Sequence, residues 1–312
     1  MAIWIRAFGK TLSKGGFSVK VSAKQKRKEK KPHLKTSMPW SIRILLFLTG
    51  LLLVTSFLAP VLFPIDLGDT DLVNRLALPS IFGISDSGHL LGCDYLGRDL
   101  AIRLLYATRT TIILALIGLS VAGILGIALG VMAGVFGGIV DDVIMFMVNV
   151  RHSIPAIIIG IIVATLFGSK ETTLILLTTL IYWTGFARQT RAMILQIMTE
   201  SYIECSRAIG SSTLRIIMEH VLRNIASPLI VHTTLSLSGI ILFESSLSYL
   251  GLGIQPPNTS LGVMVSAGKN QMVMQPWQAL IPVALIVLIV MTASLTGDWL
   301  RDRLDPKLRG KS

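Results

Sequence analysis

Long apolar stretches separated by short polar segments are the main feature of this chain. An α-helix needs about 20 predominantly apolar residues to cross the hydrocarbon core of a bilayer. Six stretches approach or exceed this length, and their apolar residues form runs rather than the alternation typical of strands. They cover residues 44–63, 111–136, 143–167, 173–186, 225–243 and 280–295. The pattern therefore predicts an all-α protein, a polytopic transmembrane helical bundle with six spans.

The positive charge of the chain is concentrated at its N-terminus. The formal net charge is +12, and residues 1–43 hold 12 of the 29 Lys and Arg residues but only one acid. Under the positive-inside rule such a tail stays in the cytoplasm, and six spans then place both termini there. The tail is suited to contact anionic membrane lipid. No folded basic domain accompanies it, so a nucleic-acid partner is not expected.

These boundaries predict four parts. Residues 1–40 are polar and basic and are expected to form a disordered cytoplasmic tail. Residues 41–110 hold the first span and an extracytoplasmic segment; the basic flank is too long for a signal peptide, so this span is interpreted as a retained anchor. The main transmembrane domain covers 111–300 and includes a cytoplasmic loop at 188–224. Residues 301–312 form a C-terminal cytoplasmic tail.

Two of the predicted spans carry features that bear on packing. Gly126, Gly130 and Gly134 recur every four residues in the second span and share one helix face, which lets another helix backbone approach closely. The third span begins with the sequence VNVRHSIP. Its polar residues are costly in lipid, so they are expected near the inner end or facing protein, and its proline permits a kink.

The cytoplasmic loop is long enough for two short helices. Residues 200–209 contain good helix formers, and Gly210 permits the left-handed turn that ends a helix. The following SST sequence can cap a second helix. The apolar face of that helix, which would lie against the membrane, is predicted from helical spacing to contain Leu214, Ile217, Met218, Val221 and Leu222.

A few polar residues are candidates for a role on the extracytoplasmic side. Glu244 lies at the outer end of the fifth span, where a carboxylate faces protein or a water-filled cavity. Asp94, Arg98 and Asp99 lie in the segment before the second span, which is expected to end in a short amphipathic helix over 99–109. For all four residues, a structural role through hydrogen bonds or charge pairs stands beside a role in contacting a substrate.

The sequence contains no motif expected of an enzyme. It lacks a complete phosphate-binding loop, a GxSxG or HExxH motif, and any cluster of His with carboxylates. Cys93 and Cys205 fall on opposite sides of the predicted bilayer, so they cannot form an intrachain disulfide. No catalytic residue, bound cofactor or metal site is therefore expected in this chain.

Four segments carry a resemblance to a known family. The cytoplasmic loop resembles the EAA loop of ABC importer permeases, in which a Glu, two small residues and a Gly precede a hydrophobic-x-Leu-Pro end. The corresponding loop residues here are Glu204, Cys205, Ser206, Ala208, Gly210, His220 and Leu222. Cys205 and Ser206 stand where two alanines are usual, and Arg223 replaces the final Pro. A His at position 220 is usual in the peptide-importer branch.

The other three segments occur in the same order as in that branch. HLLGCDYLGRD at 89–99, SLSYLGLGIQPPNTSLG at 246–262 and GDWLRDRLDPKL at 297–308 resemble the C-type permease subunit of dipeptide and oligopeptide importers. Cys93 replaces a Thr of the family pattern and Leu261 replaces a Trp. The resemblance covers about residues 40–309.

This resemblance implies a type I ABC importer permease in a bacterial or archaeal cytoplasmic membrane. The implied partners are a second, B-type permease, two cytosolic ABC ATPases that use ATP, and an extracytoplasmic substrate-binding protein. The loop around Glu204 and Gly210 would couple the ATPases to the spans. Dipeptides or oligopeptides are the expected cargo, with nickel or a metal chelate as the alternative. A proton-driven carrier is disfavoured because mid-span carboxylates are absent.

Overall fold

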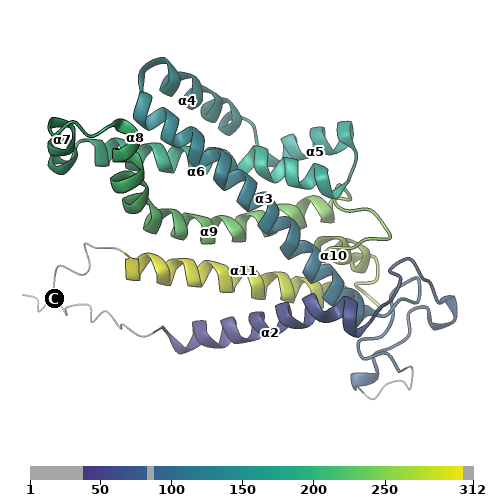
Figure 1. Cartoon of the computed structure of the whole chain (residues 1–312). Coiled ribbons are helices and arrows are strands. Elements are labelled where there is room, and N and C mark those ends of the chain that lie inside the picture. Colours follow the sequence, from purple (N-terminus) through teal and green to yellow (C-terminus); the bar gives the residue numbers. More distant parts are fainter. Residues whose placement is uncertain (1–37, 83–87, 305–312) are drawn as a thin grey trace, which may run out of the picture. The chain divides into compact units, whose positions relative to one another are not determined.

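A computed structural model describes residues 38–82 and 88–304, and this part of the chain is helical without strands (Figure 1). The predicted disorder of the N-terminal tail falls on residues 1–37, outside the described residues, as does most of the predicted C-terminal tail, 305–312. The main helices are α2 (Trp40–Leu62), α3 (Leu100–Phe136), α4 (Gly138–Ser153), α5 (Ala156–Phe167), α6 (Glu171–Met198), α7 (Ser201–Ala208), α8 (Thr213–Ile216), α9 (Leu222–Tyr249), α10 (Leu261–Lys269) and α11 (Trp277–Leu304).

Among the described residues, four helices are long and apolar enough to cross a membrane, or five spans if the bent pair of α4 and α5 counts as one. The four are α2, α3, α11 and the continuous helical run Thr213–Tyr249. They confirm four of the predicted spans. The stretch 173–186 forms the first half of α6. The second half of this helix is more polar, and α6 is not among the helices that are long and apolar enough to cross a membrane. The total of six spans remains a prediction.

The third predicted span, 143–167, is broken at the proline where a kink was predicted. It consists of α4 and α5, which meet at an angle of 89°. Proline lacks an N–H group and disfavours the helical conformation of the residue before it. Accordingly, Ile154 is extended (φ −106°, ψ 126°) and Pro155 precedes the first residue of α5.

The helix α3 begins at the end of the polar segment. The Asp99 side chain accepts a hydrogen bond of 3.0 Å from the Ile102 N–H and so caps the helix. The predicted short helix over 99–109 is therefore the first part of one continuous helix, Leu100–Phe136. The segment before it carries two 3₁₀ turns, Leu72–Asn74 and Ser80–Phe82.

Helices α3 and α6 pack closely through the predicted glycine face. A Cβ atom on Gly126 would lie 2.3 Å from the Trp183 carbonyl oxygen, and one on Gly130 would lie 2.6 Å from the Ala187 carbonyl oxygen. These distances are far too short for real contacts, so only glycine lets the two backbones approach this closely. The predicted close helix approach is confirmed, and its partner is α6.

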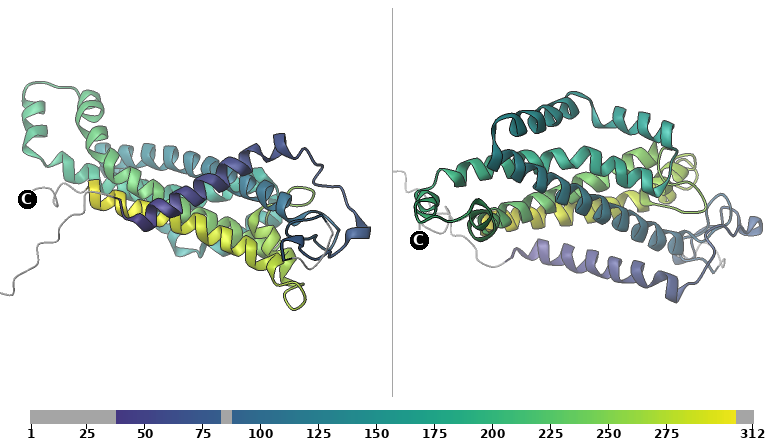
Figure 2. Two further views of the ribbon diagram at one scale, coloured as in Figure 1. Left: turned by 90° about the horizontal axis from the view of Figure 1, so that it is seen from below. Right: turned by 45° about the horizontal axis from the view of Figure 1, so that its top comes forward.

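The remaining long helices pack around this pair. Helix α9 contacts α3, α6 and α11, and α2 lies against α11 and α3 (Figures 1 and 2). The main cluster of buried apolar residues joins α3, α6, α9, α10 and α11, with Phe186, Ile194 and Ile240 among its fully buried members. A hydrogen bond of 2.8 Å between the Thr49 and Thr292 hydroxyls links α2 to α11.

Replacement of glycine by alanine is expected to have opposite effects on stability at Gly126, on the glycine face, and at Gly50, outside it. Gly126→Ala is expected to destabilise the protein by about 1–3 kcal/mol, because the new methyl group forces α3 and α6 apart. Gly50 in α2 has open space around it, so Gly50→Ala is the matched control and is expected to stabilise slightly, because Ala favours a helix over Gly by roughly 1 kcal/mol. Thermal unfolding of both variants in detergent checks this, and equal midpoints would contradict it.

Candidate functional site

The predicted helix–turn–helix of the cytoplasmic loop is present as α7 and α8, which lie at one end of the bundle (Figure 1). Gly210 has a φ of +89°, in the left-handed region. Its N–H donates to the Arg207 carbonyl at 2.9 Å, and the Ser211 N–H donates to the Ser206 carbonyl at 3.0 Å. These two bonds define a Schellman motif, which ends α7 sharply. We call residues 200–221 the elbow.

Contacts to the start of α9 hold the elbow in place. Ile203 is fully buried. The Tyr202 hydroxyl accepts a hydrogen bond of 3.0 Å from the Asn224 side-chain amide, and the Tyr202 ring packs edge-on against His220 at 5.9 Å between centroids. Helix α7 is therefore attached to α9 through packed side chains as well as through the chain. Sequence reasoning missed Tyr202 and Ile203. Ile203 is a single buried residue between two exposed neighbours in a short helix, and that pattern is no strong signal.

The candidate loop residues differ in exposure. Glu204, Cys205, Ala208 and Gly210 are exposed, and Ser206 is half-buried. The Glu204 side chain makes no hydrogen bond or ion pair with any residue that the structure describes. His220 and Leu222 are half-buried. His220 packs against the Tyr202 ring of α7, and Leu222 packs against the main cluster of buried apolar residues. The loop candidates thus divide into an exposed group around the turn and an anchoring pair.

The residues of the predicted apolar face of the second loop helix do not share one environment: Val221 is buried, Ile217 and Leu222 are half-buried, and the other two are exposed. Leu214 and Met218 are 69% and 61% exposed, whereas Ile216, Val221 and Ile225 are buried. The reason is a π-helical segment at Ile217–Val221, which continues without a break into α9. A π-helix has more residues per turn than an α-helix, so residues five apart, such as Ile216 and Val221, come to face the core together.

This shift leaves apolar side chains on the free surface of the elbow. Ile209, Leu214 and Met218 all point away from the core, with Ile209 85% exposed. Exposed apolar groups that adjoin polar residues mark surfaces where another protein docks. Arg215 and Glu219 flank them and pair with each other at 3.1 Å. The elbow therefore presents an apolar surface with charged neighbours.

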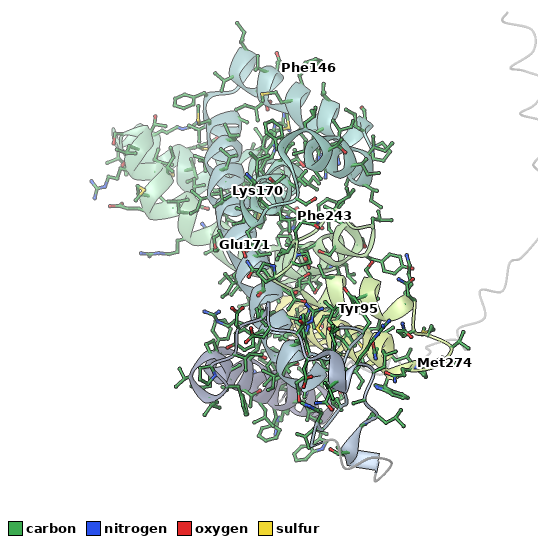
Figure 3. The ribbon with its side chains drawn as sticks, turned by 90° about the vertical axis from the view of Figure 1, so that its right-hand side faces the viewer. Tyr95, Phe146, Lys170, Glu171, Phe243 and Met274 are labelled. Atoms are coloured by element: carbon green, nitrogen blue, oxygen red, sulfur yellow. The ribbon has the colours of Figure 1, made fainter. Side chains whose placement is uncertain are left out.

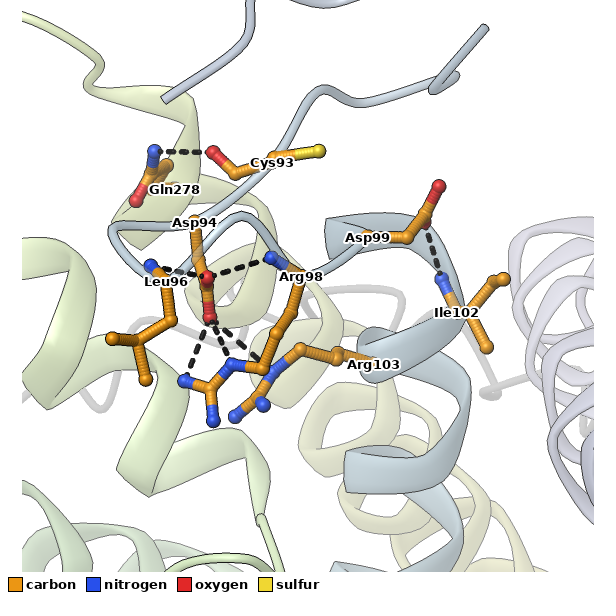
Figure 4. A network of polar contacts seen from close by, with 8 residues as sticks. All are labelled: Cys93, Asp94, Leu96, Arg98, Asp99, Ile102, Arg103 and Gln278. Atoms are coloured by element: carbon orange, nitrogen blue, oxygen red, sulfur yellow. Dashed lines mark hydrogen bonds and ion pairs between the residues drawn. The ribbon is translucent and has the colours of Figure 1, made fainter. Parts of the chain in front are cut away.

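Asp94 is the centre of a polar network in the segment before α3 (Figure 4). One carboxylate oxygen accepts bonds from the Leu96 and Arg98 N–H groups at 2.8 and 3.0 Å, and the other accepts two bonds of 2.8 Å from the Arg98 guanidinium. The Arg103 Nε atom lies 3.7 Å from the same oxygen. Asp94 and Arg103 are each only 6% exposed. A buried carboxylate is tolerated because it is fully paired.

Two further contacts hold this segment, one within it and one to a distant helix. The Asp99 carboxylate accepts a hydrogen bond of 2.7 Å from His89 Nδ1 while it caps α3. The Gln278 side chain in α11 donates a bond of 3.1 Å to the Cys93 carbonyl. Burial, followed by the nearby Asp99 and Asp94, raises the pKa of the Cys93 thiol to about 11. Arg103 and Gln278 escaped sequence reasoning, although each is a polar residue at the start of a long apolar helix.

Glu244 is buried in a cluster of serines near the end of α9. Its carboxylate accepts a bond of 2.6 Å from the Ser248 hydroxyl and lies 3.5 Å from that of Ser245. Ser248 also contacts Ser260, which caps α10 by accepting from the Val263 N–H. These contacts join α9 to α10, which is the structural arrangement considered for Glu244. The Glu244 side chain is only 1% exposed.

The candidate residues thus form two separate groups rather than one site. The elbow lies at one end of the bundle, and the Asp94 and Glu244 networks lie near α10 at the opposite end (Figure 1). Figure 3 looks onto this second end, with Tyr95 and Met274 on the side of α2 and α11 and Phe146 of α4 on the other side. Among the described residues, no group of three or more His, Cys, Asp or Glu is arranged to hold a metal ion.

Comparison with known proteins places this arrangement in a family. Residues 126–310 match the family model described as "Binding-protein-dependent transport system inner membrane component". The dipeptide transport system permease protein DppC of Haemophilus influenzae is 31% identical over 81% of this chain and 86% of its own length. The oligopeptide permease protein OppC of Escherichia coli K12 is 34% identical, covering 81% and 82%.

A nickel permease and a solved transporter show similar agreement. The nickel transport system permease protein NikC of Escherichia coli K12 is 31% identical over 87% of this chain and 96% of its own length. Among solved structures, an inward-facing MetNI methionine ABC transporter chain aligns with a TM-score of 0.54 at 20% identity, covering 66% of this chain and 98% of that chain. At this level of identity, the match to the MetNI chain shows a shared fold alone. The chain is a multi-pass membrane protein, and it belongs to the family of inner membrane components of binding-protein-dependent transport systems.

Proposed function

We propose that this chain is one of two permeases in an ATP-driven importer of dipeptides or oligopeptides. Its partners would be a B-type permease, two cytosolic ABC ATPases and an extracytoplasmic substrate-binding protein. Relatives named for dipeptide and oligopeptide transport, each aligned over more than four fifths of this chain, support the peptide cargo. ATP hydrolysis would belong to the partner ATPases, and this chain would bind no cofactor.

The observation that carries this proposal is the exposed elbow with its fixed geometry. An importer must convert closure of the ATPases into movement of the spans, and ATP drives this only by binding the two states of the transporter differently. The Schellman motif and the Tyr202 contacts make the elbow stiff. Because its second half continues directly into α9, a displacement of the elbow moves α9 as a rigid body.

The exposed candidates have distinct roles under this proposal. Glu204 would pair with a basic group of the ATPase, and Gly210 would set the angle between α7 and the following helix. Cys205, Ser206 and Ala208 would let the ATPase surface approach closely because their side chains are small. Ile209, Leu214 and Met218 would fill an apolar groove of the ATPase. His220 and Leu222 would keep the elbow attached to α9.

The polar residues at the other end would act as supports. Asp94, Arg98 and Asp99 would shape the segment before α3, and Glu244 would hold α10 against α9. Their bonds are made to groups of this chain, which favours the structural role over direct contact with cargo.

Nickel or a metal chelate is the second candidate cargo, because a nickel permease aligns with 96% of its length. Uptake assays in cells with the complete importer separate the two cargoes. The peptide proposal expects ATP-dependent uptake of a labelled tripeptide that nickel does not inhibit. Uptake of nickel without uptake of peptides would overturn it.

Two elbow substitutions test the coupling role. Gly210→Pro and Glu204→Lys are expected to reduce ATP-dependent uptake at least about 100-fold while the chain still inserts. Proline cannot adopt a φ of +89° or donate the Gly210 N–H bond, and Lys reverses the charge offered to the ATPase. Uptake is measured at equal membrane abundance, with co-purification of the ATPases as a second measurement.

Asp69→Lys is the matched control for charge reversal, because Asp69 is exposed in the segment before α3 and its side chain makes no hydrogen bond or ion pair with a described residue. It is expected to leave uptake within about twofold, as for most surface substitutions. Normal uptake by both elbow variants would contradict the proposal.

The two native cysteines test the proposed sidedness. Cys205 is exposed on the elbow and Cys93 is buried at the other end. In membranes that contain this chain without the ATPases, which would cover Cys205, a membrane-impermeant maleimide at pH 8 is expected to label Cys205 in inverted vesicles but not in intact cells. Cys93 should stay unlabelled in both, because its raised pKa of about 11 leaves its thiol protonated until well above that pH. Labelling of Cys205 from outside intact cells would refute a cytoplasmic elbow.

A further inference from the structure

The break between α4 and α5 carries two basic side chains that the proposed roles above do not use. Arg151 and His152 lie in the last turn of α4, just before Ile154 and Pro155. The Arg151 Nη1 atom and the His152 Nδ1 atom are 3.4 Å apart. Arg188 of α6 lies on the same side, where its guanidinium contacts the Asn149 side chain at 3.4 Å.

Contacts with neighbouring helices place Arg151 far from both ends of the spans. Val148, one turn before Arg151 in α4, packs with Trp183 of α6. A Cβ atom on Gly126 of α3 would lie 2.3 Å from the Trp183 carbonyl oxygen, so Gly126 is at the same level. Gly126 is 26 residues after Leu100, where α3 begins, and 10 before Phe136, where it ends. At 1.5 Å per residue, this level is roughly 15 Å or more from either end of α3.

No acid neutralises this group within the described part of the chain. Neither Arg151, His152 nor Arg188 forms an ion pair with a described carboxylate, and the Arg151 Nε atom is buried without a hydrogen-bond partner. Within α4, the acid that forms an ion pair is Asp141, and its partner is Arg191. Asp141 lies almost three helical turns before Arg151. A guanidinium at this depth is costly in lipid, so such a side chain faces protein or a water-filled cavity.

The start of α5 adds to the attraction for an anion. Helix α5 follows Pro155 directly, and no side chain caps it. The first N–H groups of a helix have no partner within the helix, and they carry a partial positive charge. In transporters, broken helices of this kind direct such ends at charged cargo near the middle of the membrane.

We propose that Arg151, His152 and the start of α5 form an anion-binding station on the translocation path, which takes the C-terminal carboxylate of the peptide cargo. This inference rests on the proposed peptide import. Arg151 makes a charge-assisted, two-pronged contact with the carboxylate. Arg188 extends the positive surface, and neutral His152, whose Nδ1 accepts from Arg151, can donate through its Nε2–H. The same surface repels a free divalent cation, so it favours a peptide over uncomplexed nickel.

The test compares a tripeptide with its C-terminal amide in the complete importer, reconstituted into vesicles of phosphatidylcholine alone. Arg151→Gln is expected to reduce uptake of the free acid about tenfold to a hundredfold, the effect of losing a charge-assisted hydrogen bond. Uptake of the amide should change by less than about twofold, as for a substitution that removes no contact. Arg151→Lys keeps the charge and should restore most of the free-acid uptake, which also controls for folding.

Arg75→Gln is the matched control, because Arg75 is exposed in the segment before α3, and it should affect neither peptide. An equal loss of acid and amide uptake in Arg151→Gln would overturn the station. So would an effect that appears only when anionic lipid is added, because the anion would then be a lipid headgroup. If the wild-type importer carries neither peptide, the proposed peptide import itself fails, which is a different result.

Discussion

The close approach of the α3 and α6 backbones is the contact on which the rest of the structure depends. Gly126 and Gly130 let α6 lie directly against α3, and α6 then runs from the α5 side of the bundle to the elbow. It supports α7 at one end and carries Tyr182 and Arg188 past the break between α4 and α5. In a membrane, helices gain little from hydrophobic burial against each other, so small residues and dense packing provide the association.

The two ends of the bundle solve different problems with local backbone geometry. At the elbow, a left-handed glycine and a π-helical segment turn a polar loop into a stiff extension of α9, with its apolar side chains left free. At the other end, Asp94 and Glu244 are buried but fully bonded to arginine, serine and backbone groups. One end leaves apolar side chains exposed, whereas the polar groups of the other end are bonded to one another.

The basic group at Arg151 differs from both. Asp94 with Arg98 and Asp141 with Arg191 form ion pairs within the described part of the chain. Arg151 lies deep in the bundle and lacks such a partner among the described residues, and the adjacent helix start is uncapped. Since an unpaired buried charge is unfavourable, a group kept in this state is suited to meet a charge that arrives from outside the chain.

Apolar run length, the glycine spacing and the signals around Gly210 were enough to infer a helical membrane protein, a close helix contact and a helix–turn–helix loop. These signals are local, because a span, a helix face and a turn each depend on residues close together in sequence. Pro155 also indicated where the third span bends. The size of that bend, 89°, the π-helical shift that buries Ile216 with Val221, and the bond from Gln278 to Cys93 could not be inferred in this way. They depend on which distant groups meet when the helices pack, and a single sequence does not encode those meetings in any local pattern.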